Sequence, residues 1–226
     1  MGQHFEGPAA ANERGFYEER AVVAVNDRIL AASGLGRRSL GQRAIGKVRR
    51  LLGLAPLPLA MARIPSRSQV LAAAAPFAQE MRALVAHVPS PGGWKDPKFV
   101  WTLEAWLQHI QRPVQLVICL RSPQDVSASV MRGYGMDEGL GPGVLQRWSA
   151  QYDRLLQVTA DHQLKAICVE YDRLIAAPAE AIARLAEFVG RPLDATLVEP
   201  ALRHHASEPA EEVRELYDRV RALSPK

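Results

Sequence analysis

The chain has 226 residues, of which 48% are hydrophobic and 23% charged, and its 28 Lys and Arg against 24 Asp and Glu give a net charge of +4. These proportions exclude a globally disordered chain, and the length fits one large domain or at most two small ones. The longest apolar runs, such as 51–62, are interrupted by Gly and Pro and fall short of the roughly 20 residues that a membrane-spanning helix needs, so we expect no transmembrane span.

The first expected helix covers residues 18–33, where apolar residues recur at helical spacing, acidic residues occupy the first turn and Gly34 follows as a stop. A basic insertion over 35–65 comes next. It lies in a longer stretch, Ile29 to Gln79, that has no acidic residue and eight Lys and Arg. Its Gly and Pro residues favour an irregular or weakly helical connector. This segment is either a solvated connector or a surface that attracts an anionic acceptor, a phosphate or an acidic membrane face.

A second helix is expected from a cap at Ser66 or Ser68 to about His87, along an apolar stripe that ends before two prolines. A short strand at 93–94 and a helix over 100–110 follow. An uninterrupted apolar run follows these elements.

The run VQLVICL at 114–120 lacks the alternation of a half-exposed strand, which predicts a central strand of a parallel sheet. Ser122 and Pro123 then open a helix as its cap and first residue. A second buried strand is expected at 165–170. Further helices are expected over 145–158 and 179–189, with a C-terminal helix in 207–226. Strands alternating with helices predict an α/β fold in a single domain over residues 1–226.

Ligands bind beyond the carboxyl ends of parallel strands, so the residues after each strand are the first candidates for a site. Arg121 follows the first strand, and Ser129 lies eight residues further on. A helix starting at Pro123 can aim both at one anionic group, with its own amides and dipole adding to the attraction. The alternative is that Arg121 pairs with Asp125 and Ser129 packs.

Two further strand exits carry polar residues. Lys95 follows the short strand and can neutralise a transferring anionic group, while Asp96 can tie down the local backbone or pair with Arg121. Tyr171 follows the second buried strand. It either lines an adenine or sugar site or caps the edge of the core.

Taken together, these pieces resemble the PAPS-dependent sulfotransferase superfamily, especially its bacterial branch. The resemblance is carried, in order, by GFYEERAVVAVNDRILAASG, WKDPKFVWTLEAW, LVICLRSPQDVSASV and VEYDRLIAAPAEAIARLAEFVGRPLD, with Lys98 replacing the usual Arg of the second motif. It covers most of residues 12–194. The resemblance implies a P-loop-NTPase-like parallel sheet flanked by helices and PAPS (3′-phosphoadenosine 5′-phosphosulfate) as the donor, without a metal.

The resemblance also implies residue roles. It places Arg121 and Ser129 on the 3′-phosphate of the donor and Tyr171 near the adenosine, and it makes Lys95 a candidate for stabilising the transferring sulfuryl group. Glu18 is the first choice for the base that takes the acceptor's proton. Glu19 is the second choice for this base, and as an alternative it serves only as a first-turn acid that favours the helix dipole.

One departure from the family is a missing segment. The family carries a first strand and an Arg-Ser-Gly-Thr-Ser loop that holds the 5′-phosphosulfate, and neither Gly2 nor Gly7 lies in a Gly-x-x-x-x-Gly-Lys pattern that could substitute. Three explanations stay open: the chain starts too late, the protein is a degenerate member without catalysis, or another subunit or residue set fills the gap.

We therefore expect a sulfotransferase-like protein that transfers a sulfuryl group from PAPS to a hydroxyl of a carbohydrate, lipid or small metabolite. The alternative is a degenerate, non-catalytic relative that binds nucleotide or serves as an assembly partner. A nucleotide kinase relative is a third interpretation, which would equally need a phosphate loop.

Partners and compartment follow from weaker signals. The pI near 9.3 comes with no zinc-finger spacing or RNA-binding aromatic signature, so we expect no nucleic-acid partner. An anionic acceptor, peripheral contact with a membrane and a homodimer are compatible with the sequence. The start of the chain lacks a secretory signal, which predicts a cytoplasmic protein. Cys119 and Cys168 sit inside apolar runs without metal-ligand spacing, so we expect free, structural thiols.

Overall fold

A computed structural model describes residues 18–35, 64–133, 141–199 and 208–223, together with residues 48 and 51. Nearly all of the basic insertion expected at 35–65 lies outside the described residues. The chain divides into two compact units, one made of Met1–Lys47 and Ala62–Pro113 and the other of Val48–Met61 and Val114–Lys226. The single domain expected from the sequence stays a prediction.

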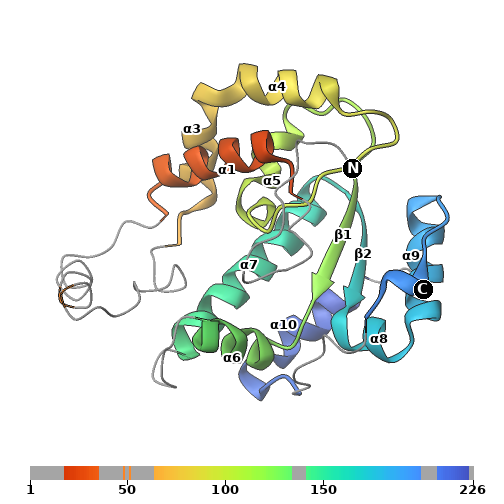
Figure 1. The fold of residues 1–226 in the computed structure, drawn as a ribbon. Helices are drawn as coiled ribbons and strands as arrows, with labels where there is room; N and C mark the ends of the chain where they lie inside the picture. The colour runs from red at the N-terminus through yellow and green to blue at the C-terminus, as the bar shows by residue number, and fades with distance from the viewer. Residues whose placement is uncertain are drawn as a thin grey trace. The chain divides into compact units, whose positions relative to one another are not determined.

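The described part of the first unit is helical (Figure 1). Its elements are α1 (Arg20–Ala32), α3 (Arg67–Ala74), the 3-10 turn η2 (Ala75–Phe77), α4 (Ala78–His87) and α5 (Phe99–Leu107). The short strand expected at 93–94 is wrong, because residues 92–96 have no regular secondary structure. Pro91 and Pro97 flank this stretch and Gly92 lies in it, and proline and glycine both disfavour a strand interior.

The helix expected from Ser66 to His87 begins as predicted but is interrupted. Ser66 Oγ accepts a hydrogen bond from the Gln69 amide (3.2 Å), and Gln69 Oε1 accepts one from the Ser66 amide (3.0 Å), which completes a capping box. The interruption falls at η2, which contains Pro76. Proline has no amide hydrogen to donate to the preceding turn, so the regular α-helix stops and restarts as α4.

The core of the first unit lies where one face of each helix meets the others. Because apolar residues three and four apart share a helix face, this packing needs only a regular stripe on each helix. The buried cluster consists of Val22, Val25, Ile29, Val70, Ala74, Met81, Ala105 and Trp106.

The second unit contains a parallel pair of strands, β1 (Gln115–Leu120) and β2 (Lys165–Glu170). Its other elements are α6 (Pro123–Gly133), α7 (Gly141–Asp161), α8 (Tyr171–Ala176), α9 (Pro178–Val189), the 3-10 turn η4 (Ala195–Leu197) and α10 (Glu211–Arg221). Figure 1 shows the two arrowheads at the same end of the sheet. The register pairs Leu120 with Glu170, the last residue of each strand.

The prediction of β1 as a central strand buried on both faces is wrong for the described residues, where the sheet has two strands. Ile118 and Leu120 are buried, whereas Val117 is 39% exposed and Cys119 is exposed. The buried face packs in a cluster with side chains of α7 and α10. The parallel pairing and the free state of both cysteines are as predicted, and the thiol of Cys168 is buried.

No helix in the described part of the chain is long and apolar enough to cross a membrane.

Candidate functional site

Arg121 and Tyr171 meet at the carboxyl ends of the two parallel strands. Each is the first residue after the paired strand ends Leu120 and Glu170, so the register brings them side by side. The guanidinium carbon of Arg121 lies 4.9 Å from the centroid of the Tyr171 ring, which is a cation–π contact. The sheet therefore assembles these two predicted site residues into one cluster, which we call the strand-end pair.

The guanidinium of Arg121 keeps a free donor in this arrangement. Its Nε–H is buried and has no hydrogen-bond partner among the described residues. Buried donors in folded proteins are nearly always paired, so an unpaired one is a position where a ligand acceptor lowers the free energy. The forked guanidinium matches the oxygens of a phosphate.

Helix α6 begins beside the strand-end pair. Pro123 is its first residue, as predicted, and the buried Ser122 donates from its hydroxyl to Gln124 Oε1 at 3.3 Å. The Val126 amide donates to the Ser122 carbonyl (3.0 Å), which starts the helical hydrogen bonds. Ser129 is exposed on α6, and in the described part of the chain no hydrogen bond joins it to Arg121. The structure thus shows a direct contact of Arg121 with Tyr171, and the shared role of Arg121 and Ser129 stays a prediction.

A second cluster lies in the first unit, where Lys95 Nζ and Glu18 Oε1 are 2.5 Å apart in an ion pair. Glu18 is only 9% exposed at its side chain, whereas Lys95 is 57% exposed. The two residues are 77 positions apart in the chain. The folded unit therefore joins two predicted catalytic residues, a buried carboxylate and an ammonium group that reaches solvent.

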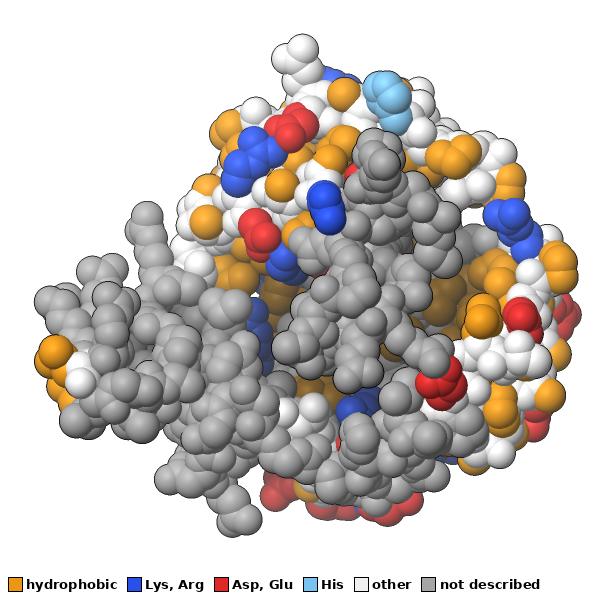
Figure 2. Space-filling view, viewed as in Figure 1, with side chains coloured by type: hydrophobic (Ala, Val, Ile, Leu, Met, Phe, Trp, Pro, Cys, Tyr) orange, Lys and Arg blue, Asp and Glu red, His pale blue; other side chains and the backbone are white. Residues whose placement is uncertain are grey.

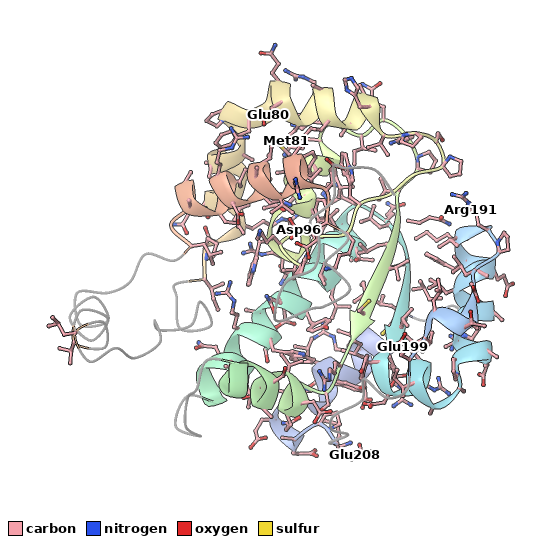
Figure 3. The ribbon with its side chains drawn as sticks, in the orientation of Figure 1. Glu80, Met81, Asp96, Arg191, Glu199 and Glu208 are labelled. Carbon is pink, nitrogen blue, oxygen red and sulfur yellow. The ribbon has the colours of Figure 1, made fainter. Side chains whose placement is uncertain are left out.

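The segment that carries Lys95 is held by a buried amide on α1. Asn26 is fully buried; its Nδ2 donates to Asp96 Oδ2 at 2.8 Å (Asp96 is labelled in Figure 3). The Asn26 carbonyl oxygen accepts from Thr102 Oγ1 and from Trp106 Nε1, each at 2.8 Å. One side chain of α1 thus fixes both the residue after Lys95 and the helix that follows it.

Asp96 also accepts a hydrogen bond from the Lys98 amide at 2.9 Å, so its predicted role in tying down the local backbone is confirmed. Lys98, which stands where the family usually has Arg, forms an ion pair with Asp27 of α1 at 2.9 Å. Asn26 and Asp27 therefore fasten the segment 95–98 from adjacent positions on one helix.

Glu19, the second choice for a base, differs from Glu18. It is the N-cap residue of α1, its carbonyl accepts the Val23 amide (2.9 Å), and its side chain makes no capping hydrogen bond. The helix starts at Arg20 and has no acid in its first turn, so the prediction of first-turn acids is wrong by one or two residues. The contact with Lys95 favours Glu18.

Asn26 and Thr102 are site-supporting residues that the sequence analysis missed. The signal was present: Asn26 stands inside the apolar stripe of its helix, next to Val22, Val25 and Ile29. A buried amide side chain needs partners for both its donor and its acceptor groups. A lone asparagine in such a stripe therefore points to a buried polar network.

The buried thiol of Cys168, in the second unit, stays protonated at neutral pH and is therefore a poor nucleophile. Burial raises the pKa of the Cys168 thiol to about 12, and the negative charge of Glu170 acts in the same direction. The described residues also contain no group of three or more His, Cys, Asp or Glu side chains that could hold a metal ion. On the face shown in Figure 2, the described Lys and Arg side chains lie scattered among acidic and apolar ones.

The second unit thus places an arginine and a tyrosine side by side at the carboxyl ends of parallel strands, which is where ligands bind in open parallel sheets. The chain matches the family model of the sulfotransferase family over residues 19–195, and it therefore belongs to that family. Members of this family generally use PAPS as the sulfuryl donor. Neither a search of curated proteins nor a search of solved structures gave a match.

Proposed function

We propose that the protein transfers a sulfuryl group from PAPS to a hydroxyl group of a carbohydrate, lipid or small metabolite. The observation that carries this proposal is the strand-end pair, which lies inside the segment that matches the sulfotransferase family. Arg121 and Ser129 bind the 3′-phosphate of the donor, and Tyr171 lies near its adenosine. The buried, unpaired Nε–H of Arg121 supports this assignment because it supplies a donor for a phosphate oxygen.

The chemical step is an in-line displacement at sulfur. The acceptor oxygen forms a bond to sulfur while the bond from sulfur to the phosphate oxygen breaks, and 3′,5′-adenosine bisphosphate leaves with the electron pair. Glu18 takes the proton of the acceptor hydroxyl, with Glu19 as the second choice. Lys95 neutralises the charge on the transferring group, an electrostatic contribution of the kind that cations make in phosphoryl transfer. The ion pair of Glu18 and Lys95 supports these two roles, since base and cation must be within reach of one group.

The experiment that tests the donor site is calorimetric binding of 3′,5′-adenosine bisphosphate and of 5′-AMP, which lacks the 3′-phosphate. Arg121→Ala removes a charge-assisted contact, so we expect it to weaken binding of the bisphosphate by about 10-fold to 100-fold and to leave binding of 5′-AMP nearly unchanged. Arg191→Ala is the matched control, because Arg191 is an exposed arginine just after α9 (Figure 3).

Two results would overturn the donor assignment. One is a well-folded wild-type protein that does not bind the bisphosphate, and the other is an Arg121→Ala variant that binds it as tightly as the wild type. Binding of the bisphosphate without transfer from PAPS to any acceptor in a broad panel of hydroxyl compounds would favour the non-catalytic alternative. The panel includes anionic acceptors, since attraction of such an acceptor by the segment 35–65 stays a prediction.

A further inference from the structure

Helix α10 lies outside the segment that matches the family, yet it is part of the core of the second unit. Its buried residues are Val213, Leu216, Tyr217 and Val220, and they pack in one cluster with Ile118 and Leu120 of β1, Cys168 of β2 and Trp148 of α7. The helix therefore covers one face of the sheet formed by β1 and β2. Arg121 and Tyr171 follow the carboxyl ends of these two strands.

The helix is well formed by its own residues. Glu211 and Glu212 occupy its first turn and Arg219 and Arg221 its last, which favours the helix dipole at both ends. Arg214 donates to the Pro209 carbonyl at 2.9 Å and so fixes the entry into the helix. These contacts stabilise α10 and hold its first turn to the preceding residues.

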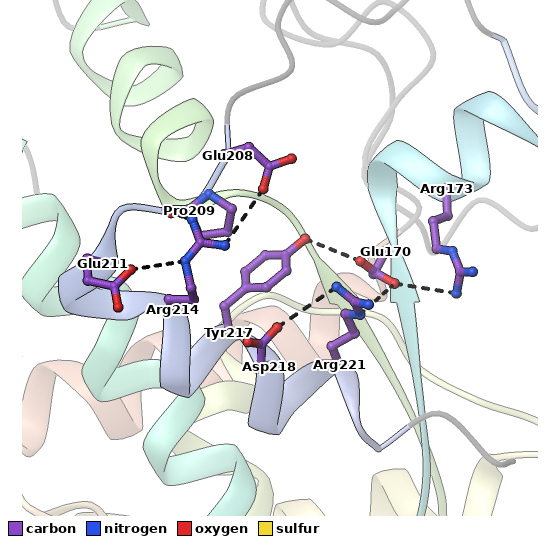
Figure 4. Close-up of polar contacts among 9 residues, drawn as sticks. All are labelled: Glu170, Arg173, Glu208, Pro209, Glu211, Arg214, Tyr217, Asp218 and Arg221. Atoms are coloured by element: carbon purple, nitrogen blue, oxygen red, sulfur yellow. Dashed lines mark hydrogen bonds and ion pairs between the residues drawn. The ribbon is translucent and has the colours of Figure 1, made fainter.

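The polar side of this helix converges on Glu170 (Figure 4). The Tyr217 hydroxyl donates to Glu170 Oε2 at 3.4 Å, and Arg221 Nε lies 3.7 Å from Glu170 Oε1. Arg173 approaches the same oxygen at 3.7 Å from α8. The Glu170 side chain is only 11% exposed, so these partners, rather than water, surround most of its carboxylate.

Glu170 occupies a decisive place in the chain. It is the last residue of β2 and the N-cap of α8, and its backbone is extended, with φ −71° and ψ 124°. The next residue is Tyr171. A side chain that holds Glu170 therefore also holds the point where the chain turns and the Tyr171 ring is set against Arg121.

We propose that Tyr217 and Arg221 of α10 are positioning residues for the donor site, acting through Glu170 to fix Tyr171 in the strand-end pair. This inference rests on the proposed function, because it assigns α10 to the same nucleotide site. It extends that site by a helix that the family match does not include.

The test compares two arginines of one helix. Arg221 and Arg219 are both 55% exposed at the side chain and each has an acidic partner on another element at 3.7 Å, Glu170 for Arg221 and Asp153 of α7 for Arg219. We expect Arg221→Gln to raise the Kd for 3′,5′-adenosine bisphosphate by about fivefold and Arg219→Gln to leave it unchanged. Measurement at a temperature where each variant is shown to be folded removes the effect of stability on the Kd.

A double-mutant cycle of Arg221 and Glu170 tests whether Arg221 acts through Glu170 or only contributes to packing. Because Glu170→Gln removes the buried charge that Arg221 neutralises, we expect this change to raise the Kd clearly less in the Arg221→Gln background than in the wild type, and Arg221→Lys to retain most of the affinity. Equal Kd values for the wild type, Arg221→Gln and Arg219→Gln would overturn the inference, as would strictly additive effects of the two changes.

A measurement without ligand keeps the inference distinct from the proposed function. Hydrogen exchange of the amides over 171–176 reports on the order of α8, and we expect it to be faster in Arg221→Gln than in Arg219→Gln. If the wild type does not bind the bisphosphate, the proposed function fails. If it binds but neither the Kd nor the exchange responds to Arg221→Gln, the role of α10 fails alone.

Discussion

Asn26 shows how a single amide can organise a site that it does not itself form. Its donor and acceptor groups are used by Asp96, Thr102 and Trp106, all of them buried. Removal of the amide leaves three polar groups without this partner in a region that water does not reach. Each such group costs about 1 to 3 kcal/mol.

We therefore expect Asn26→Ala to lower the free energy of unfolding by about 3 kcal/mol or more. The matched control is the neighbouring Asp27→Ala, which removes an ion pair from a side chain that is 59% exposed and is expected to change stability by less than about 1 kcal/mol. Urea unfolding followed by circular dichroism measures both. Equal losses in the two variants would contradict the role of the amide network.

Lys95 and Lys98 offer a comparison for the chemical step. If Lys95 neutralises the transferring group, Lys95→Ala lowers the rate of transfer from PAPS by about 100-fold or more while the Kd for 3′,5′-adenosine bisphosphate stays nearly the same. Lys98→Ala, which removes the ion pair with Asp27, keeps most of the rate. Rates are measured with radiolabelled PAPS on the best acceptor of the panel. A Lys95→Ala variant with the wild-type rate would exclude the assigned role.

At the scale of elements, the start of α3 tests how far a local motif stabilises the first unit. Ser66→Ala removes the hydroxyl of the capping box, and we expect a loss of about 1 kcal/mol in the free energy of unfolding. Ser68→Ala is the control, because the Ser68 hydroxyl contacts the Ser66 hydroxyl at 3.1 Å and caps no amide. A loss in Ser68→Ala as large as in Ser66→Ala would show that the cap is not the cause.

The elements that the sequence predicted well are those with a clear period. The helices now seen as α1, α5, α7 and α9 and both strands were expected within a few residues of their bounds. The break at Pro76 was visible in the sequence but was overlooked behind a continuous apolar stripe. Helix α8 was missed because six residues are too few to show a period. The short strand was expected from a motif rather than from a pattern of its own.

The site was predictable where it depends on strand ends. The rule that ligands bind beyond the carboxyl ends of parallel strands selected Arg121 and Tyr171, and their contact follows from the register. The pairing of Glu18 with Lys95 could not be derived, since it depends on how helices pack over a long separation in sequence. The burial of β1 on one face also depends on neighbours that an apolar run does not specify.

At the scale of the whole molecule, buried acidic groups predict how stability depends on pH. Burial raises the pKa of Cys168 from the ordinary 9.0 to about 12, and burial also raises the pKa values of Tyr152 and Tyr217. Above pH 9 the unfolded chain loses the thiol proton that the folded chain retains. The stabilisation is therefore complete below pH 9 and is lost between pH 9 and about 12.

We expect the free energy of unfolding to decrease as the pH rises above 9, by up to about 1.4 kcal/mol per pH unit for each group that titrates only in the unfolded chain. Cys168→Val removes one such group and should make the decrease shallower between pH 9 and 10. Urea unfolding at intervals from pH 7 to 10.5 measures the slope. Identical slopes for the wild type and the variant would show that the buried thiol does not contribute.

The ion pair and the amide network of the first unit join residues that are far apart along the chain: Glu18 to Lys95 over 77 positions, Asn26 to Asp96 over 70 and Asn26 to Trp106 over 80. Contacts at such separations require the chain to close a long loop, which costs conformational entropy. Only the packing of the surrounding helices compensates this cost. No short piece of the polypeptide holds Glu18 against Lys95 on its own. The contact between Glu18 and Lys95 therefore depends on the packing of the helices of the first unit.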